Sequence, residues 1–250
     1  MSRLVFRGKC DGVAWQKQIR DKYISEGTPD VPHLDVKKAI VRPVTRNLAK
    51  QIILKYEWLG TLVPAQLYYG IFFGNYCAGV TCVSLGGGGA NVYAHKEWGV
   101  TPQELAYLNR GANVHWSPKG ANSKLVSWTC RFLKRDTAAK IVIAYADTDA
   151  GEYGTIYQAC NWICVGKGSS TEQWVAPNGR VYDQKLPWNL ARANGGTRKN
   201  WVLALKKAGW RTQLSNPKYR YVYILDKNDK RLCELVEKKR VPYPKRPGQE

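Results

Sequence analysis

Two polar side chains follow the most apolar run of the chain. Asp147 comes directly after IVIAYA (residues 141–146), and Tyr157 lies in the stretch EYGTIYQACNWICV that follows. A short continuous apolar run predicts a strand that is buried on both faces of a sheet. Ligands of α/β proteins lie at the carboxyl ends of such strands, so Asp147 is a candidate proton acceptor, with capping of a loop or helix as its alternative role. Tyr157 falls in a short predicted helix, where packing against the sheet is the simplest interpretation.

A third candidate, Arg110, lies near the end of the strand predicted for ELAYLNRGAN (residues 104–113). A fixed guanidinium there could bind a phosphate or a developing oxyanion, although an ordinary surface arginine would look the same. His115 follows shortly after and is interpreted as a structural histidine.

Strands and helices alternate in the elements that must position these residues. KKAIVRPVT (residues 37–45) predicts a strand, and TRNLAKQIILKYEW (residues 45–58) predicts a helix capped by Thr45. Residues 67–73 and 77–85 predict a hairpin with its turn at Gly74-Asn75. Strand 104–113 leads to a helix for which we expect Asn122 or Ser123 to be the N-cap. The order closes with strand 141–146, the short helix and the strand WICVG.

The chain changes in character beyond Gly166. EQWVAPNGRVYD (residues 172–183) predicts a hairpin with Asn178-Gly179 at its turn, and TRKNWVLALKKAGW (residues 197–210) predicts a helix that ends at Gly209. KYRYVYILDKNDKRLCELV (residues 218–236) predicts a strand with alternating aromatics, followed by a second hairpin turn.

The net charge of +20 is distributed unevenly. Residues 51–165 carry a net charge of only +2, whereas residues 1–50 carry +6 and residues 166–250 carry +12. A nearly neutral middle with basic flanks indicates a polyanionic partner, and nucleic acid is the expected one. The basic residues that we expect to bind phosphates are Arg180, Lys185, Arg192, Arg198, Lys199, Arg211, Lys218 and Arg220.

Cysteine usage and hydropathy limit the compartment. The seven cysteines include no CxxC pair and no Cys/His cluster typical of a zinc site, so we expect reduced thiols and leave any metal requirement open. No apolar run reaches the ~20 residues needed to span a bilayer, and the start of the chain lacks the apolar core of a secretory signal. A soluble intracellular protein is therefore expected.

The order of elements over residues 38–166 resembles that of the GNAT acyltransferases. The resemblance implies an α/β (α+β) fold with a central mixed β-sheet flanked by helices. In that family the loop and helix after the fourth strand bind the pyrophosphate of an acyl-CoA through backbone N–H groups. A tyrosine in the helix after the fifth strand often protonates the departing thiolate, which is the role implied for Tyr157. The corresponding loop SPKGANSKL supplies Lys119, Gly120, Asn122, Ser123 and Lys124 as the implied cofactor-binding residues.

A more specific resemblance covers roughly residues 38–245. The ordered set KYEWLG, YYGI, CAGVTC, LNRGAN, SKLVSW, YADTDAG, GTIYQA and KYRYVYILDK resembles the bacteriophage Mom family of DNA modification proteins. This implies a GNAT-like transferase that adds a methylcarbamoyl (acetamido) group to the exocyclic amine of adenine in double-stranded DNA. Such an enzyme would protect phage DNA from host restriction and act in the cytoplasm of the bacterial host. The implied functional positions are Arg110, Ser123, Asp147 and Tyr157, with Tyr69 as a weaker addition.

The product implied by the resemblance leaves the donor open. Acetyl-CoA is the usual donor of the superfamily, but an acetyl group contains no nitrogen and a methylcarbamoyl group does. An activated glycyl donor, such as a charged tRNA, has the right atoms, and the second small residue of SPKGANSKL is displaced from the usual CoA-loop pattern. RNA is thus a second expected partner. Adenine must also leave the base stack to react. Candidate aromatic surfaces for it are Trp58, Trp116, Trp174, Trp188 and Trp201.

Two other functions fit the same observations. One is an acetyl-CoA-dependent acyltransferase that acts on RNA or protein amines, and the other is a non-catalytic, basic DNA-binding protein on a GNAT scaffold. The expected domain organisation is a basic N-terminal extension (residues 1–37), a GNAT-like catalytic core (residues 38–166) and a basic, DNA-binding C-terminal extension packed on the core (residues 167–250).

Overall fold

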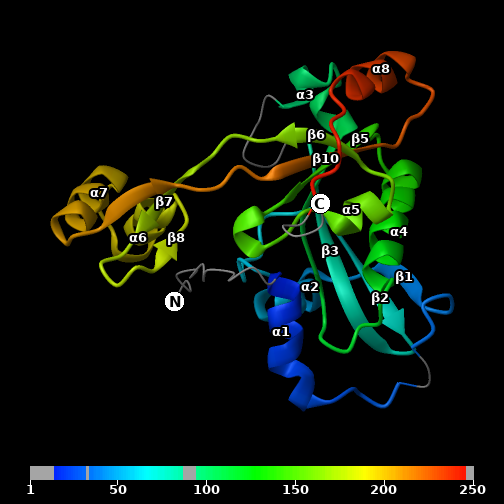
Figure 1. Ribbon diagram of the computed structural model, residues 1–250, viewed down its shortest axis with the longest axis horizontal. Coiled ribbons are helices and arrows are strands. Elements are labelled where there is room, and N and C mark those ends of the chain that lie inside the picture. Colours follow the sequence, from blue (N-terminus) through cyan, green and yellow to red (C-terminus); the bar gives the residue numbers. More distant parts are fainter. Residues whose placement is uncertain (1–13, 32–33, 87–93, 246–250) are drawn as a thin grey trace.

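The main body of the protein is a seven-stranded mixed sheet with strand order β1-β2-β3-β4-β5-β10-β6. The computed structural model describes residues 14–31, 34–86 and 94–245 (Figure 1). Strands β4 and β5 are parallel, and all other neighbours in this sheet are antiparallel. The strands are β1 (Ile40–Pro43), β2 (Leu67–Phe73), β3 (Tyr76–Leu85), β4 (Leu105–Asn113), β5 (Ile141–Ala146), β6 (Ile163–Lys167) and β10 (Tyr219–Ile224).

Helices cover both faces of this sheet. Val142 and Ala144 of β5 face the cluster that contains the apolar side of α4, whereas Ile141 and Ile143 face a second cluster that contains α8. Strand β5 is therefore buried on both faces, as its continuous apolar sequence predicted. The helices of the main body are α1 (Trp15–Tyr23), α2 (Arg46–Tyr56), α3 (Ala94–Glu97), α4 (Ala121–Asp136), α5 (Thr155–Ala159) and α8 (Lys230–Lys238), with 3-10 turns η1 (Ile24–Glu26), η2 (Pro102–Glu104) and η3 (Thr148–Ala150).

The predicted order of strands and helices over residues 38–166 is confirmed, with α3 as an element that was not predicted. Thr45 caps α2, because its hydroxyl accepts the N–H of Leu48 at 3.3 Å. The β2–β3 hairpin turns at Gly74-Asn75, and Tyr157 lies in the short helix α5. Together these elements form the GNAT-like mixed sheet flanked by helices that the order of elements predicted.

Residues 172–214 form a separate unit, here called the inserted subdomain, between β6 and β10. It has its own three-stranded sheet, in the order β8-β7-β9, and its own core of Trp174, Leu186 and Leu205. Figure 1 shows that it lies apart from the main body, at the end of two neighbouring chain segments. Its elements are β7 (Glu172–Val175), β8 (Val181–Tyr182), α6 (Leu186–Asn194), α7 (Arg198–Lys207) and β9 (Arg211–Leu214).

The region expected to be one C-terminal extension is thus divided by the structure. Strand β10 lies inside the main sheet between β5 and β6, and α8 packs against it. A local pattern of alternating aromatics predicts a strand but cannot show its distant partners. The prediction of a second hairpin turn after this strand was wrong, because Asp229 accepts the N–H of Leu232 at 3.0 Å and starts helix α8. Helices α1 and α6 were not predicted.

Two further properties concern the part of the chain that the structure describes. No described helix is long and apolar enough to cross a membrane. The cysteines that the structure describes are unpaired thiols, with Cys82, Cys130 and Cys164 buried in the core.

Gly154 occupies a position where only glycine fits. It precedes α5 with φ of 72°, and a Cβ there would lie 2.2 Å from Cε2 of Tyr221. Tyr221 is fully buried and donates its hydroxyl to Tyr153 O at 2.7 Å, so its ring has little room to move. We expect Gly154→Ala to lower the free energy of unfolding by roughly 2–4 kcal/mol, through overpacking plus left-handed backbone strain.

Urea unfolding of the wild type and of Gly154→Ala measures this difference in free energy of unfolding. Gly179→Ala is the matched control, since Gly179 has φ of 80° but no atom lies within 4 Å of the position that the alanine methyl would occupy. We expect that variant to lose only about 1 kcal/mol from strain. Equal losses in both variants would show that the Tyr221 contact does not matter.

Candidate active site

The parallel strands β4 and β5 separate toward their carboxyl ends. They pair only from Leu105 opposite Ile141 to Leu108 opposite Ala144, although β4 continues to Asn113. The pairing of β3 with β4 is irregular at this point, because Arg110 and Leu108 face successive residues of β3 and Asn109 is left over. Such a bulge bends a strand and increases its twist. The sheet therefore opens where β4 and β5 end.

Five ionisable side chains, here called the acid–base cluster, gather at this opening: Glu57, Arg110, Asp147, Glu152 and Lys218. Nε of Arg110 lies 3.6 Å from Oε1 of Glu57, and Nζ of Lys218 lies 2.7 Å from Oδ2 of Asp147. The charges of Glu57, Asp147 and Lys218 all act on Glu152. Residues from the end of α2, from β4, from the turn after β5 and from the start of β10 thus share one electrostatic environment.

Glu152 is the member suited to proton transfer near neutral pH. Burial, followed by repulsion from Glu57 and Asp147, raises its pKa to about 7. A carboxyl with such a pKa can accept a proton at neutral pH and return it, because both of its protonation states are populated. The sequence analysis did not select Glu152.

Glu57 holds Arg110 in place. Its Oε2 accepts the backbone N–H groups of Leu59 at 2.8 Å and Gly60 at 3.0 Å, and burial raises its pKa while the charge of Arg110 opposes that rise. Arg110 also donates from Nε to Thr61 O at 3.3 Å and from Nη1 to Asn109 O at 2.9 Å. The guanidinium is therefore fixed in direction, as a group that binds an anion must be.

Asp147 combines both roles that its sequence position allowed. It is buried, its Oδ1 accepts the N–H of Asp149 at 3.1 Å and so caps η3, and its Oδ2 pairs with Lys218. Both oxygens are engaged, so Asp147 fits a positioning role, while Glu152 fits the role of proton acceptor.

Tyr157 lies half-buried between aromatic rings. Its ring is 5.0 Å from Trp162 and 5.2 Å from Tyr221, centroid to centroid. Burial, followed by the charge of Glu152, raises its pKa well above the ordinary value. The phenol stays protonated at neutral pH and can donate its proton or a hydrogen bond.

The loop before α4 has the features of an anion-binding helix N-terminus. The N-cap is Gly120 with φ of 90°, two residues before Asn122, the nearer of the two expected caps, and no side chain caps the helix. The backbone amides of the first turn, at Asn122 and Ser123, are thus left to other acceptors. Lys119 and Gly120 are exposed. These residues fit the pyrophosphate of an acyl-CoA.

Lys124 differs from the other implied cofactor residues. Its Nζ donates to Val36 O at 2.7 Å and to Lys37 O at 2.9 Å. These bonds fasten the segment before β1 to α4, so Lys124 serves the scaffold in this structure.

Helices α4 and α5 contact each other at the loop end of α4. The Cys160 thiol donates to Ser123 O at 3.4 Å, and the Ser127 hydroxyl donates to Cys160 Sγ at 3.5 Å. The structure therefore brings Ser123 close to the end of the helix that carries Tyr157.

Tyr69 does not join this group. Its ring stacks on Phe132 at 5.2 Å, and burial, aided by the charge of Asp136, raises its pKa to about 12. Phe132 lies eleven residues beyond the first residue of α4, which corresponds to about 16 Å along the helix. His115 is structural, as interpreted, since its ring nitrogens contact Tyr56 Oη at 3.0 Å and Gly27 O at 2.7 Å.

The predicted phosphate-binding residues fall into two groups. Lys218 and Arg220 are half-buried and engaged in the main body, Lys218 with Asp147 and Arg220 with both carboxylate oxygens of Glu97 at 2.8 Å. Their charge is committed to these ion pairs, which corrects their assignment as phosphate ligands. The other six predicted phosphate-binding residues are exposed on the inserted subdomain: Arg180, Lys185, Arg192, Arg198, Lys199 and Arg211.

Sequence reasoning missed Glu57 and Glu152, although a signal was present. Residues 51–165 contain only seven acidic residues, and both glutamates stand next to aromatic residues within the stretches KYEWLG and EYGTIYQA. An acidic residue among residues that will be buried is a candidate for a perturbed pKa. Within the described ranges, no three His, Cys, Asp or Glu side chains are arranged to hold a metal ion.

The fold and the opened sheet define an α+β protein of the GNAT-like class. The Mom protein family matches residues 38–245, and the chain belongs to that family. Solved structures with which it can be superposed include FeeM, an N-acyl amino acid synthase from uncultured soil microbes, at 13% identity and a TM-score of 0.44, covering 75% of this chain and 91% of that one. An acetyltransferase from Bacillus subtilis in complex with CoA aligns at 11% identity and a TM-score of 0.42, covering 75% and 99%. The ribosomal-protein-S5-alanine acetyltransferase from Vibrio fischeri aligns at 10% identity and a TM-score of 0.41, covering 76% and 94%. Among curated proteins no match was found.

The raised pKa of Glu152 predicts a pH-dependent stability difference. The folded protein holds this proton more tightly than the unfolded chain between the ordinary pKa of 4.5 and about 7, so the wild type loses stability as pH rises through that window. The free energy of unfolding of Glu152→Gln, taken relative to that of the wild type, should therefore be ~1–3 kcal/mol higher at about pH 8 than at about pH 4.

Urea unfolding at both pH values, with the exposed Glu172→Gln as control, measures this gain. The control should show no pH-dependent difference from wild type. A Glu152→Gln difference that stays constant with pH would mean that Glu152 titrates normally.

Proposed function

We propose that this chain transfers a methylcarbamoyl (acetamido) group to the exocyclic amine of adenine in double-stranded DNA, and so protects phage DNA from host restriction in the bacterial cytoplasm. Membership of the Mom protein family supports the reaction class. The observation that carries the proposal is the carboxyl of Glu152, with a pKa of about 7, in the same cluster as Arg110 at the opening between β4 and β5.

The acceptor needs a base, because the lone pair of the adenine amine is delocalised into the ring. As the amine attacks a carbonyl carbon it must lose a proton, and the Glu152 carboxylate accepts it. Negative charge develops on the carbonyl oxygen in the same step. Arg110, held by Glu57 and by Thr61 O, stabilises that charge.

The leaving group needs an acid. Tyr157, whose phenol is protonated at neutral pH, donates to the departing sulfur or oxygen atom. The Asp147–Lys218 pair keeps the turn after β5 in shape and thereby positions Glu152, whose backbone N–H donates to Asp147 O at 3.0 Å.

Lys119, Gly120, Asn122 and Ser123 would hold the pyrophosphate if the donor is an acyl-CoA, which supplies the activated acyl group when bound. If the donor is a glycyl ester of RNA, the adenine amine attacks the ester carbonyl and releases the ribose hydroxyl. The free glycyl amine then attacks the adenine ring carbon that carries the acylated exocyclic nitrogen. The bond from that ring carbon to the acylated nitrogen breaks. This isomerisation leaves the methylene on the ring-bound nitrogen and an amide at the end, with no atom gained or lost.

Mass spectrometry of nucleosides tests the chemistry. Plasmid DNA from cells that express the chain should contain a heavier deoxyadenosine. Glu152→Gln and Tyr157→Phe should each lower its yield at least about tenfold, because a positioned acid or base contributes a hundredfold or more to the rate. Glu172→Gln should modify DNA normally.

Unmodified DNA with the wild-type chain, together with acetylated RNA or protein, would favour the alternative acyltransferase. DNA modification that is unchanged in Glu152→Gln and Tyr157→Phe would remove these residues from the mechanism.

Isotope-labelled glycine identifies the donor. Cells grown with glycine labelled at carbon and nitrogen should yield a modified deoxyadenosine that carries both labels in the added group. A modified base without label would exclude the glycyl donor and leave acetyl-CoA, in which case the added group contains no nitrogen.

A further inference from the structure

The inserted subdomain carries a surface that the chemistry above does not use. Between residues 184 and 225 the chain has nine Lys/Arg and no Asp/Glu. Lys218 and Arg220 are engaged in the main body, and the others lie on the inserted subdomain. The seven cations between residues 185 and 211 are all exposed on the inserted subdomain with no acidic residue among them, and such a surface attracts polyanions.

Helices α6 and α7 form a tight pair within this segment. They are joined by Gly195, Gly196 and Thr197, and both glycines have left-handed φ values, of 78° and 83°. Thr197 caps α7 by accepting the N–H of Asn200 at 3.2 Å, and Trp201 Nε1 donates to Gly195 O at 2.9 Å. The turn, and therefore the angle between the helices, is fixed by its own hydrogen bonds.

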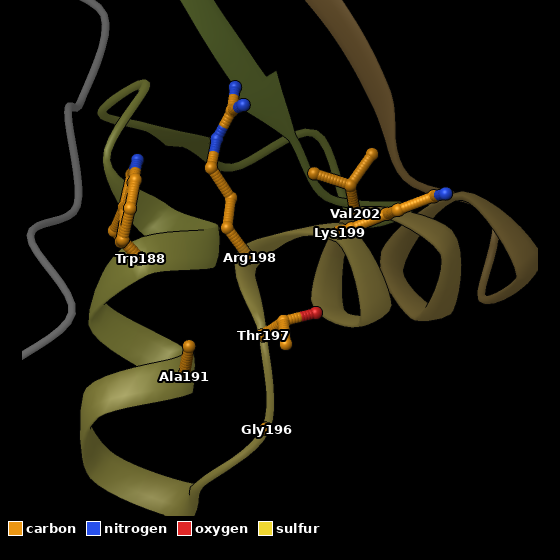
Figure 2. Close-up of a pocket in the computed structure, with 7 residues that line it drawn as sticks. All are labelled: Trp188, Ala191, Gly196, Thr197, Arg198, Lys199 and Val202. Carbon is orange, nitrogen blue, oxygen red and sulfur yellow. The ribbon is translucent and has the colours of Figure 1, made fainter.

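A hollow of about 720 Å³ lies between the two helices, lined by Trp188 and Ala191 of α6 and by Thr197, Arg198, Lys199 and Val202 around the start of α7. Trp188 is 58% exposed, which is unusual for the largest apolar side chain. Figure 2 shows that Trp188 and Arg198 point in the same direction from neighbouring positions on the two sides of the hollow. An aromatic face and a cation are thus presented together.

The chemistry of the hollow matches one class of ligand. The first turn of α7 contributes the positive end of the helix and two cationic side chains, which suits a phosphate. The exposed indole offers an apolar face against which a deoxyribose of the backbone can pack. A ligand that alternates phosphates with sugar rings satisfies both features, whereas an acidic peptide satisfies only the first.

We propose that the hollow between α6 and α7 binds one strand of duplex DNA, with a phosphate on the first turn of α7 and its neighbouring deoxyribose against Trp188. The choice of DNA rests on the proposed function. The duplex is held on the inserted subdomain while adenine reacts at the acid–base cluster.

The connection between the two units fits this division of labour. The two segments that link them bond to each other, with Thr171 N–H to Ser215 Oγ at 3.0 Å, Ser215 N–H to Thr171 O at 2.9 Å and Gly168 N–H to Lys218 O at 2.9 Å. Asn216 Nδ2 donates to Asp149 Oδ1 at 2.8 Å, and Lys218 pairs with Asp147. The link ends on the turn that positions Glu152.

Fluorescence anisotropy of a labelled DNA duplex with the full chain tests the proposal. Arg198→Ala/Lys199→Ala should weaken binding at least about tenfold and make the slope of log affinity against log salt shallower by about two. The matched control is Lys206→Ala/Lys207→Ala, which removes the same charge from the same helix outside the hollow, and we expect about twofold weakening. Trp188→Ala should weaken binding about fivefold with an unchanged salt slope, and Trp188→Phe should keep most of the affinity.

These positions are exposed or line the hollow, so thermal unfolding should match wild type in every variant. Equal losses of affinity in the two double variants would overturn the proposal. They would show that the total positive charge, and not the position of the cations at the hollow, determines DNA binding. The proposal would also be overturned by wild-type affinity in Trp188→Ala, competition by polyglutamate equal to that by unlabelled DNA, or a tenfold preference for an RNA duplex of the same sequence.

Binding is measured in the Glu152→Gln background as well, which separates it from catalysis. Loss of binding in the hollow variants supports the inference even if mass spectrometry finds no modified adenine. If the hollow variants modify adenine normally and bind DNA as tightly as the wild type, the proposed function is supported and the inference about the hollow is wrong.

Discussion

The site depends on the point at which β4 and β5 stop pairing. Parallel strands that stayed in register would place Arg110 opposite Ala146, the last residue of β5, and leave no space between the two strands. The bulge at Asn109 ends the pairing after Leu108, so the strands diverge and their carboxyl ends lead to different helices, α4 and α5. The start of α4 and the end of α5 consequently meet, through the bond from the Cys160 thiol to Ser123 O.

Charge balance within that opening determines how the cluster behaves. Glu57 and Asp147 each have a cation within 4 Å, whereas among the described residues Glu152 has no such ion pair. A buried carboxylate without a close partner favours its neutral form, and two acidic neighbours strengthen that preference. The raised pKa of Glu152 therefore follows first from burial, and then from the pairing of the two cations with Glu57 and Asp147 instead of with Glu152. Moving one cation would change which residue can act as the base.

The rest of the chain anchors this arrangement from both sides. Helix α1 packs Trp15 against Trp58 at 5.1 Å, next to Glu57, and Arg20 of the same helix donates from Nε to His115 O at 2.9 Å and also bonds Ser117 O. One helix thus spans the turn of Glu57 and the segment that leads to the anion-binding loop. On the other side, β10 supplies both Lys218 and the sheet neighbour of β5, and it connects the inserted subdomain to the cluster.

The sequence by itself determined the local elements, since capping by Thr45, the Gly74-Asn75 turn and the apolar run before Asp147 depend on neighbours in the chain. It also indicated Arg110, Ser123, Asp147 and Tyr157 as a group. Only the tertiary structure decided that Tyr69 lies elsewhere, that Lys218 and Arg220 belong to ion pairs, and that Glu57 and Glu152 complete the cluster. The physical reason is that pKa values and ion pairs depend on burial and on residues up to 161 positions apart, such as Glu57 and Lys218, and no local pattern encodes which distant strands will become neighbours.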